Sequence, residues 1–263
     1  MLTAKDLKLI PKSFDVIGDI LVFADFPKEL IKKEKKIGSY LLKKLKNVKV
    51  VTRKTRHFSG VYRLQKLKIM AGEERKETLH KENNCMFKLN VETCYFSPRL
   101  GNERLRIAKQ VKKNEKILVM FSGVSVYSII LSKKSNAREI YDIEINPIAN
   151  KYAEENLVLN KVRNVKLIRG DVRKIVPKLK KKFDRIVMPL PKGGEDFLEL
   201  ALNKIKKNGV IHFYDFLREE EIPETGIEKI KKMKRKFKIL NVVKCGQIAP
   251  EKYRVCFDIK ILN

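Results

Sequence analysis

A glycine and several acidic residues in the second half of the chain have the types and spacing of a nucleoside-binding site. The segment FSGVS (121–125) follows one apolar run, and Glu144 ends the next, 21 residues after Gly123. An acid at about this distance is placed to accept both hydroxyls of a ribose. A third apolar run ends in GDV (170–172), where Asp171 can accept from an adenine amino group. These residues predict a site for a cofactor that contains adenosine.

The glycine content of the first segment separates two classes of cofactor. A dinucleotide has a pyrophosphate that needs a full GxGxxG loop, and this segment supplies only Gly123. S-adenosylmethionine carries no phosphate, so the segment suits it better. For each acid alone, a chance position at the end of a generic strand–helix unit is the alternative. The ordered set on successive strands argues against chance, and we predict S-adenosylmethionine as the cofactor.

Such a site needs parallel strands whose carboxyl ends meet at one edge of a sheet. From residue 116 onward, apolar runs typical of strands alternate with segments typical of helices, which predicts a doubly wound α/β sheet. The expected strands are 116–123, 139–145, 164–170, 183–189, 209–216, 238–244 and 253–261, with the last two antiparallel. The expected helices are 125–132, one after Asn146-Pro147, 172–180, 194–206 and 224–236.

The first hundred residues predict a small α+β unit with too little helix for a Rossmann fold. Short strands are expected within 13–26, at 48–52 and 66–70, and twice within 78–96, with a helix over 28–46. Arg53 to Gly60 is expected to be a basic, polar link. A helix over 102–111 with Asn102 as its N-cap follows. We therefore expect two domains, 1–111 and 112–263.

The charge balance predicts a polyanionic partner. Sixty Lys and Arg against 31 Asp and Glu give a formal charge of +29, and 43% of the residues are hydrophobic, so the chain can build real cores. RNA, DNA and an anionic membrane surface are the partners that this charge favours. The basic residues are spread along the chain, and a generally lysine-rich surface is the alternative explanation for any single run.

Several functional classes are not supported. No stretch reaches the ~18 consecutive apolar residues of a membrane-spanning helix, and the first residues lack the apolar core of a signal peptide. The four cysteines show no CxxC and no spacing typical of metal ligands, so we expect reduced, mostly buried thiols in a cytoplasmic protein. Nothing resembles a metal site or a Ser/His/Asp triad.

Longer segments resemble a known family. The chain resembles archaeal and eukaryotic tRNA (guanine-37 N1)-methyltransferases, and relatives that act on wyosine precursors at the same nucleotide. The resemblance lies in the segments FSPRLGNERLRIA, FSGVSVYSI, IEINPIANKYAEENLVLNKV, GDVR, FDRIVMPLPKGGEDFLELAL, GVIHFYDF, APEKYRVCFDIKI and SFDVIGDI. The resemblance covers nearly the whole chain. It implies an α/β, Rossmann-like class I methyltransferase sheet, preceded by a small α+β RNA-recognition domain that helps hold the anticodon stem-loop of tRNA. We expect a monomer with no obligate protein partner and no membrane association.

The resemblance also implies roles for particular residues. Guanine N1 is a weak nucleophile while protonated, and Glu103 occupies the position of the family's general base; an ordinary first-turn glutamate is the alternative. Arg63 matches best the arginine that holds guanine O6, with a phosphate-contacting or plain surface arginine as the alternative, and Pro189 completes the predicted catalytic set. The predicted cofactor-binding residues are Arg104, Phe121, Gly123, Val124, Glu144, Ile145, Asp171, Val172, Leu190 and Pro191. The predicted RNA-binding residues are Arg53, Arg56, Arg63, Arg99 and Lys192.

Three positions depart from the family pattern. Many relatives have Asp where this chain has Val119, a second loop glycine where it has Ser125, and Asn where it has Pro189. The first two changes bear on cofactor affinity. The third removes a side chain that can contact guanine, leaves the backbone carbonyls of Pro189 or Leu190 to accept from the base, and could shift the substrate toward a tricyclic wyosine precursor. The family's further N-terminal domain, which grips the outer corner of tRNA, is not expected here.

Two other functions stay open at this point. The related aminocarboxypropyl transferase of the wyosine pathway uses the same cofactor but attacks a different carbon of it. Its relatives tend to carry MGYV where this chain has MPLP (188–191), which argues against it. A basic RNA-binding protein on a decayed methyltransferase fold is the second alternative, and Val119 and Ser125 are the residues that suggest it.

Overall fold

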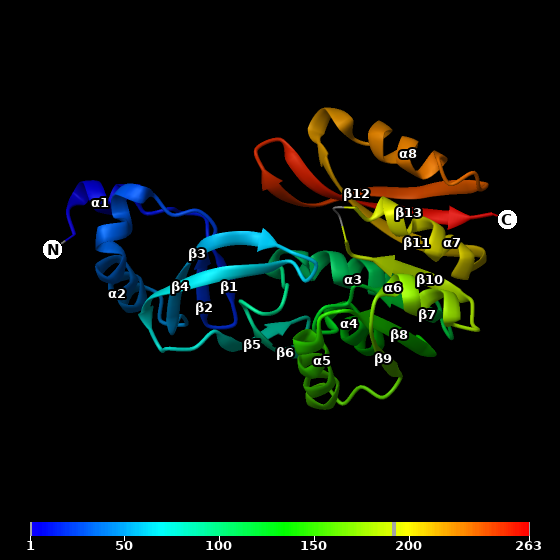
Figure 1. Cartoon of the computed structure of the whole chain (residues 1–263), viewed down its shortest axis with the longest axis horizontal. Coiled ribbons are helices and arrows are strands. Elements are labelled where there is room, and N and C mark those ends of the chain that lie inside the picture. Colours follow the sequence, from blue (N-terminus) through cyan, green and yellow to red (C-terminus); the bar gives the residue numbers. More distant parts are fainter. Residues whose placement is uncertain (1, 191–192, 263) are drawn as a thin grey trace. The chain divides into compact units, whose positions relative to one another are not determined.

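The computed structural model describes residues 2–190 and 193–262. The chain forms two compact units that divide at Pro98 (Figure 1). Helix α3 (Gly101–Gln110) thus belongs with the second unit, whereas the sequence suggests a boundary after residue 111. The physical reason is packing: Arg106 of α3 forms an ion pair with Asp258 near the end of the chain. Among the described residues, no helix combines the length and the apolar content that crossing a membrane requires.

The first unit is built on a four-stranded sheet of order β1-β2-β3-β4. Strands β1 (Asp15–Ile17) and β2 (Ile20–Phe23) form the expected hairpin, and β2 is parallel to β3 (Val50–Ser59). The crossover between β2 and β3 is helical, as predicted. Its helices pack Leu30 and Ile37 against the sheet, where they join a buried apolar core. The helices of this unit are α1 (Ala4–Leu9), η1 (Lys28–Lys33) and α2 (Glu34–Lys44).

The basic segment from Arg53 to Gly60 is a strand over most of its length, not the link that the sequence suggested. Strand β3 runs on to Ser59 and pairs antiparallel with β4 (Leu64–Gly72). Its last residues are exposed and, apart from Phe58, polar, so no apolar alternation marks them as a strand; backbone pairing alone extends it. Strands β5 (Glu77–Glu82) and β6 (Cys85–Asn90) form the expected second pair.

The second unit is a seven-stranded sheet of order β12-β13-β11-β10-β7-β8-β9. Strands β7 to β11 are parallel, and β13 runs antiparallel to both of its neighbours, which confirms the doubly wound Rossmann-like sheet and its antiparallel finish. The strand order reverses between β7 and β10, the place where such sheets bind ligands. The strands are β7 (Lys116–Met120), β8 (Glu139–Glu144), β9 (Val165–Arg169), β10 (Phe183–Met188), β11 (Ile205–Arg218), β12 (Phe237–Ala249) and β13 (Lys252–Ile261).

Two helix predictions need correction. Helix α3 begins at Gly101, so Asn102 lies inside the first turn and is not the N-cap. Helix α8 (Glu224–Lys231) is shorter than the expected 224–236, and Lys234 just beyond it has a left-handed backbone that ends helical continuation. The other helices are η2 (Pro98–Leu100), α4 (Val126–Lys134), α5 (Pro147–Leu159), α6 (Val172–Ile175), η3 (Val176–Lys178), η4 (Glu195–Phe197), α7 (Leu198–Lys204) and η5 (Glu219–Glu221).

The two faces of the large sheet differ in chemistry. One face packs against α6, α7 and α8 through a single apolar cluster that includes Met120, Ile143, Phe213 and Phe257. Because side chains alternate along a strand, the neighbouring residues of the same strands point to the opposite face. Those neighbours include the buried polar residues Asp142, Glu144, Arg185, His212, Tyr214 and Asp258.

Candidate active site

The turn between β7 and α4 has an unusual backbone for residues other than glycine. Phe121, Gly123 and Ser125 all have positive φ, at 59°, 61° and 65°. The turn is drawn toward β8 because the Gly123 N–H donates to Glu144 Oε2 over 2.8 Å. The sequence puts Glu144 21 residues after Gly123, at the end of the next strand, and the structure pairs β7 with β8 side by side.

Glu144 is a buried carboxylate with capacity left for a ligand. Its two oxygens accept from the backbone N–H groups of Gly123 and Asn146, over 2.8 and 2.7 Å. Burial raises the pKa of Glu144, and the backbone donors oppose that rise. A carboxylate has about four acceptor positions, so acceptor capacity remains for a ligand hydroxyl. The predicted residue Ile145, next in the chain, is half-buried.

Buried asparagines after Glu144 hold the turn and were not assigned roles from the sequence. Asn146 caps α5 by accepting from the N–H of Ile148 and Ala149. The Asn150 amide donates to the carbonyls of Glu144 and Asn146, and the Asn156 amide donates to the carbonyl of Val124 over 3.2 Å. The sequence signal that could have identified them is the recurrence of asparagine on the buried side of α5, where apolar residues are usual.

The ends of β9 and β10 carry the next predicted residues. Asp171 caps α6 and pairs with Arg173 over 2.6 Å, and hydrogen bonds from Arg173 lower the pKa of Asp171. The side chain of Val172 is buried in the apolar cluster, and that of Val124 is also fully buried, so these two can offer a ligand only their backbone.

Pro189 and Leu190 are half-buried directly after β10, and the Leu190 N–H donates to the Met188 carbonyl over 2.7 Å. A Cβ at Gly194 would lie 2.3 Å from the Leu190 carbonyl oxygen, so position 194 requires glycine for this close approach to Leu190. The predicted residues Pro191 and Lys192 lie outside the described residues.

Glu103 is buried in a network of hydrogen bonds. Its carboxylate accepts from the Arg106 guanidinium over 2.6 and 2.9 Å and from the Tyr214 hydroxyl over 2.7 Å. The Tyr214 hydroxyl is also 3.0 Å from that of Tyr127, which lies on α4 directly after the turn. Burial raises the pKa of both tyrosines, so both hydroxyls keep their protons. Glu103 is therefore linked to the helix that begins at the candidate cofactor turn.

Arg106 continues the network to the centre of the sheet. Its guanidinium also donates to both oxygens of Asp258, over 2.6 and 3.0 Å. Asp258 faces His212 Nδ1 over 2.6 Å, and His212 Nε2 faces the Arg185 guanidinium over 2.6 Å. Arginine is a donor only, so Nε2 accepts and Nδ1–H donates to Asp258. Burial lowers the pKa of His212, which agrees with this neutral tautomer.

His212, Cys256 and Asp258 have ligand atoms within 4.8 Å of one another, close enough for a metal ion. Asp258, however, also accepts from Gln110 and Asn241. Two guanidiniums border the group, and they would repel a cation. We assign these residues to the hydrogen-bond network.

The predicted arginines have different surroundings. Arg104 is buried, with its guanidinium over the Tyr127 ring at 5.5 Å. Arg53 is paired with Glu34 over 2.6 Å and is mostly buried, so its charge serves the packing of α2 on β3. Arg56 is exposed on β3, and Arg63 has a left-handed backbone in the β3–β4 turn. Arg99 is exposed in η2.

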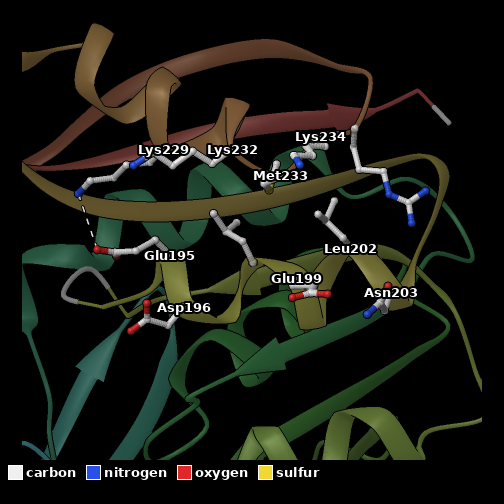
Figure 2. Close-up of a pocket in the computed structure, with 11 residues that line it drawn as sticks. Glu195, Asp196, Glu199, Leu202, Asn203, Lys229, Lys232, Met233 and Lys234 are labelled. Carbon is white, nitrogen blue, oxygen red and sulfur yellow. Dashed lines mark ion pairs between the residues drawn. The ribbon is translucent and has the colours of Figure 1, made fainter.

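A groove of about 590 Å³ lies between α7 and α8 (Figure 2). It is on the side of the sheet opposite to Glu144, and Glu195 and Lys229 approach each other there at 3.9 Å. Its walls carry both glutamates and lysines, so its charge favours neither anions nor cations, and none of the predicted site residues that the structure describes line it.

The residues of the second unit fit S-adenosylmethionine by the chemistry of their donors and acceptors. The carboxyl ends of three adjacent parallel strands carry these groups. They are the turn after β7 with positive φ at Phe121 and Gly123, the carboxylate of Glu144 at the end of β8, and Asp171 after β9. Such a set can hold a ribose and an adenine without phosphate-binding groups.

Comparison with known proteins agrees with this assignment. Residues 78–243 match the TRM5/TYW2 methyltransferase domain, and residues 1–75 match the TYW2 N-terminal domain. The tRNA (guanine(37)-N(1))-methyltransferase Trm5b of Pyrococcus abyssi is 40% identical over 97% of this chain and 76% of its own length. The tRNA 4-demethylwyosine(37)-methyltransferase Taw21 of Saccharolobus solfataricus is 34% identical over 97% of this chain and 96% of its own length.

Solved structures show the same likeness. A complex of aTrm5 with tRNALeu superposes with a TM-score of 0.87 at 35% identity, covering 98% of this chain and 74% of that one. Methanocaldococcus jannaschii Trm5 in complex with adenosine superposes with a TM-score of 0.83 at 36% identity, covering 98% and 76%. The fold is that of the S-adenosylmethionine-dependent methyltransferases, and the chain belongs to the TRM5/TYW2 methyltransferase family.

Proposed function

We propose that this protein transfers a methyl group from S-adenosylmethionine to N1 of guanosine 37 in tRNA. The observation that carries the proposal is the connected site of the second unit, in which Glu144 holds the β7–α4 turn and Glu103 is bound through two tyrosines to the helix after that turn. Relatives named as guanine-37 N1-methyltransferases match nearly the whole chain, which supports the same reaction.

The cofactor would be held by residues at the strand ends. When bound, S-adenosylmethionine supplies an electrophilic methyl group on a sulfonium. Glu144 would accept from the ribose hydroxyls, and Asp171 from the adenine amino group. The backbone of Phe121, Gly123, Val124, Ile145, Val172 and Leu190 would line the rest of the cofactor site, with Arg104 orienting the cofactor from α3.

Glu103 would act as the general base. Its carboxylate accepts from the Arg106 guanidinium and the Tyr214 hydroxyl, and it would take the N1 proton of guanine as the methyl group is transferred. Arg106 loses one anionic partner when Glu103 becomes neutral, but it keeps Asp258. The Arg106–Asp258 pair thus allows Glu103 to change charge without leaving a buried cation alone.

The first unit would bind the anticodon stem-loop. Arg63 is proposed to hold guanine O6, and the carbonyl of Pro189 or Leu190 would accept from the base. Arg56 and Arg99 are exposed and suited to phosphate contacts. Arg53 is a weaker candidate because its guanidinium is engaged by Glu34.

A second candidate function is methylation of 4-demethylwyosine at the same position. The observation that favours it is Pro189, which is half-buried after β10 and offers neither a side-chain amide nor an N–H to a guanine. An apolar residue there suits a base with an additional ring. Relatives that carry this activity in their names, alone or together with guanine-37 methylation, are 34–36% identical to this chain.

The experiment is to incubate the protein with unmodified tRNA and, separately, with tRNA carrying 4-demethylwyosine, using methyl-labelled S-adenosylmethionine. Nucleosides are then identified by mass spectrometry. Label in 1-methylguanosine supports the first proposal, and label in the tricyclic base supports the second. An aminocarboxypropyl adduct would assign the third chemistry of the family. Tight tRNA binding with no product would indicate an RNA-binding protein on an inactive fold.

A further inference from the structure

Asp142 is a buried carboxylate that no predicted role uses. It lies on β8, two residues before Glu144, and is 1% exposed. Burial raises its pKa, and the neighbouring hydroxyls of Ser122, Ser128 and Ser125 oppose that rise. A buried acid without a cationic partner needs hydrogen-bond donors to remain in place. The donors that Asp142 uses belong to the turn that precedes α4.

The two oxygens of Asp142 hold opposite ends of the candidate cofactor turn. The Ser122 hydroxyl donates to Oδ1, and the Ser125 hydroxyl donates to Oδ2 over 2.7 Å. Between these serines lies Gly123, whose N–H is held by Glu144. Asp142 and Glu144 are two residues apart on one strand, so they face the same side of the sheet, and together they hold the turn at Ser122, Gly123 and Ser125.

The conformation of Ser125 explains why this support is needed. Ser125 is fully buried and left-handed, with φ 65° and ψ 28°, a conformation that is costly for residues with a Cβ. It stands at the N-cap position of α4, yet its side chain makes no capping hydrogen bond. The hydroxyl is directed to Asp142 instead. Val119, directly across from Asp142 on β7, is apolar and offers no alternative acceptor.

We propose that Asp142 is a positioning residue that sets the shape of the cofactor turn through Ser122 and Ser125. This inference rests on the proposed use of that turn for S-adenosylmethionine. Ser125 and Asp142 would then depend on each other. The hydrogen bond to Asp142 offsets the cost of a left-handed serine, and the serine hydroxyls offset the cost of burying the carboxylate.

The test is a double-mutant cycle with Asp142→Ala on one axis and Ser122→Ala/Ser125→Gly on the other. Binding of S-adenosylhomocysteine is measured by calorimetry, thermal unfolding is measured without ligand, and tRNA affinity is measured separately. Asp142→Ala alone leaves two buried hydroxyls without acceptors, and we expect affinity for S-adenosylhomocysteine to fall about tenfold or more. The affinity for tRNA should change little, because the turn carries none of the exposed arginines assigned to phosphate contacts.

The decisive result is whether Asp142→Ala raises or lowers the melting temperature and the S-adenosylhomocysteine affinity of the Ser122→Ala/Ser125→Gly variant. Ser122→Ala/Ser125→Gly removes both turn hydroxyls that donate to the buried carboxylate and leaves only the neighbouring Ser128 hydroxyl beside it. Adding Asp142→Ala in that background should therefore raise the melting temperature and the affinity for S-adenosylhomocysteine. The same loss in both backgrounds would overturn the proposal. If Asp142→Ala does not fold, the triple variant decides: recovery of folding supports the pairing, and failure to fold contradicts it.

A conservative variant and the unliganded readout separate this inference from the proposed function. Asp142→Asn keeps one acceptor and can donate to a serine oxygen, so it should retain most of the affinity. Absence of S-adenosylhomocysteine binding by the unaltered chain would refute the proposed function, while the melting temperatures of the cycle would still decide the pairing. Binding by the unaltered chain with no coupling in the cycle would refute the pairing alone.

Discussion

Removal of Arg106 should destabilise the second unit strongly, because two buried carboxylates depend on it. The side chains of Glu103 and Asp258 are 3% and 0% exposed, and Arg106 approaches each of them to 2.6 Å. Breaking a buried ion pair by removing one partner costs about 3–5 kcal/mol, since the remaining charge is uncompensated. For Arg106→Gln we expect a loss within this range at pH 7, because His212, Gln110 and Asn241 still hold Asp258.

The loss should depend on pH with a definite sign. Burial tends to raise the pKa of Asp258, but hydrogen bonds from His212 and Arg106 outweigh it and hold the pKa below the ordinary value. A carboxyl with a depressed folded pKa adds stability above its unfolded pKa of about 3.9 and loses that contribution as pH falls. Arg106→Gln raises the folded pKa of Asp258 toward the ordinary value. The difference in stability between the native chain and the variant should therefore begin to shrink as pH falls toward about 4 and continue to shrink below it.

The assay is amide hydrogen exchange in peptides from β11 and β13, measured as a function of urea concentration at pH 7 and at pH 4. It reports the second unit rather than an average over both units. The matched control is Arg173→Gln, which removes an ion pair of the same 2.6 Å length from an arginine that is 67% exposed. Solvent screens that pair, so its removal should change exchange little. A loss below about 1 kcal/mol for Arg106→Gln, or an equal loss at both pH values, would refute the reasoning.

Three further outcomes are expected. Glu103→Gln should lower kcat about 10²–10⁴-fold while S-adenosylhomocysteine affinity is unchanged in calorimetry; unaltered turnover would remove Glu103 from the mechanism. Glu144→Gln places an amide N–H against the N–H of Gly123 or Asn146, so KM for S-adenosylmethionine should rise about 10–100-fold. An unchanged KM in steady-state kinetics would contradict the proposed role of Glu144 in cofactor binding. With a charge of +29, tRNA affinity measured from 50 to 400 mM salt should fall steeply, and a log–log slope shallower than about −2 would mean too few phosphate contacts.

The sheet of the second unit was predictable because its central strands, β7, β8, β10, β11 and β13, are mostly buried and read as largely apolar runs. The same rule failed at β3, where Arg56 and its neighbours are exposed and backbone pairing alone continues the strand. It also could not separate α3 from the first unit, because the ion pair between Arg106 and Asp258 joins residues that are 152 positions apart. Contacts at that separation leave no local pattern.

The site was predictable where acids end successive strands. Gly123 and Glu144 both follow from the spacing of strand ends, and the structure adds the hydrogen bond between them. Asp142 was missed because an acid in the middle of an apolar strand has no local signal for its partners, and Asn150 and Asn156 were missed because their acceptors are backbone carbonyls. The charge of Arg53 suggested RNA, and only the position of Glu34 on the neighbouring helix shows that its charge is used internally.

The division of the large sheet into an apolar and a polar face ties the fold to the proposed chemistry. On β13, Phe257 enters the apolar cluster while its neighbour Asp258 holds Arg106, and on β11, Phe213 and His212 divide in the same way. A slip of one residue in the pairing of these strands would exchange the two faces, placing a phenylalanine where Arg106 needs a carboxylate. The buried ions therefore favour one register, as buried polar groups do in other systems. Glu103 is bound to this same face through Arg106 and Tyr214. The register of β11 and β13 that buries the apolar cluster is therefore also the register that positions the proposed base.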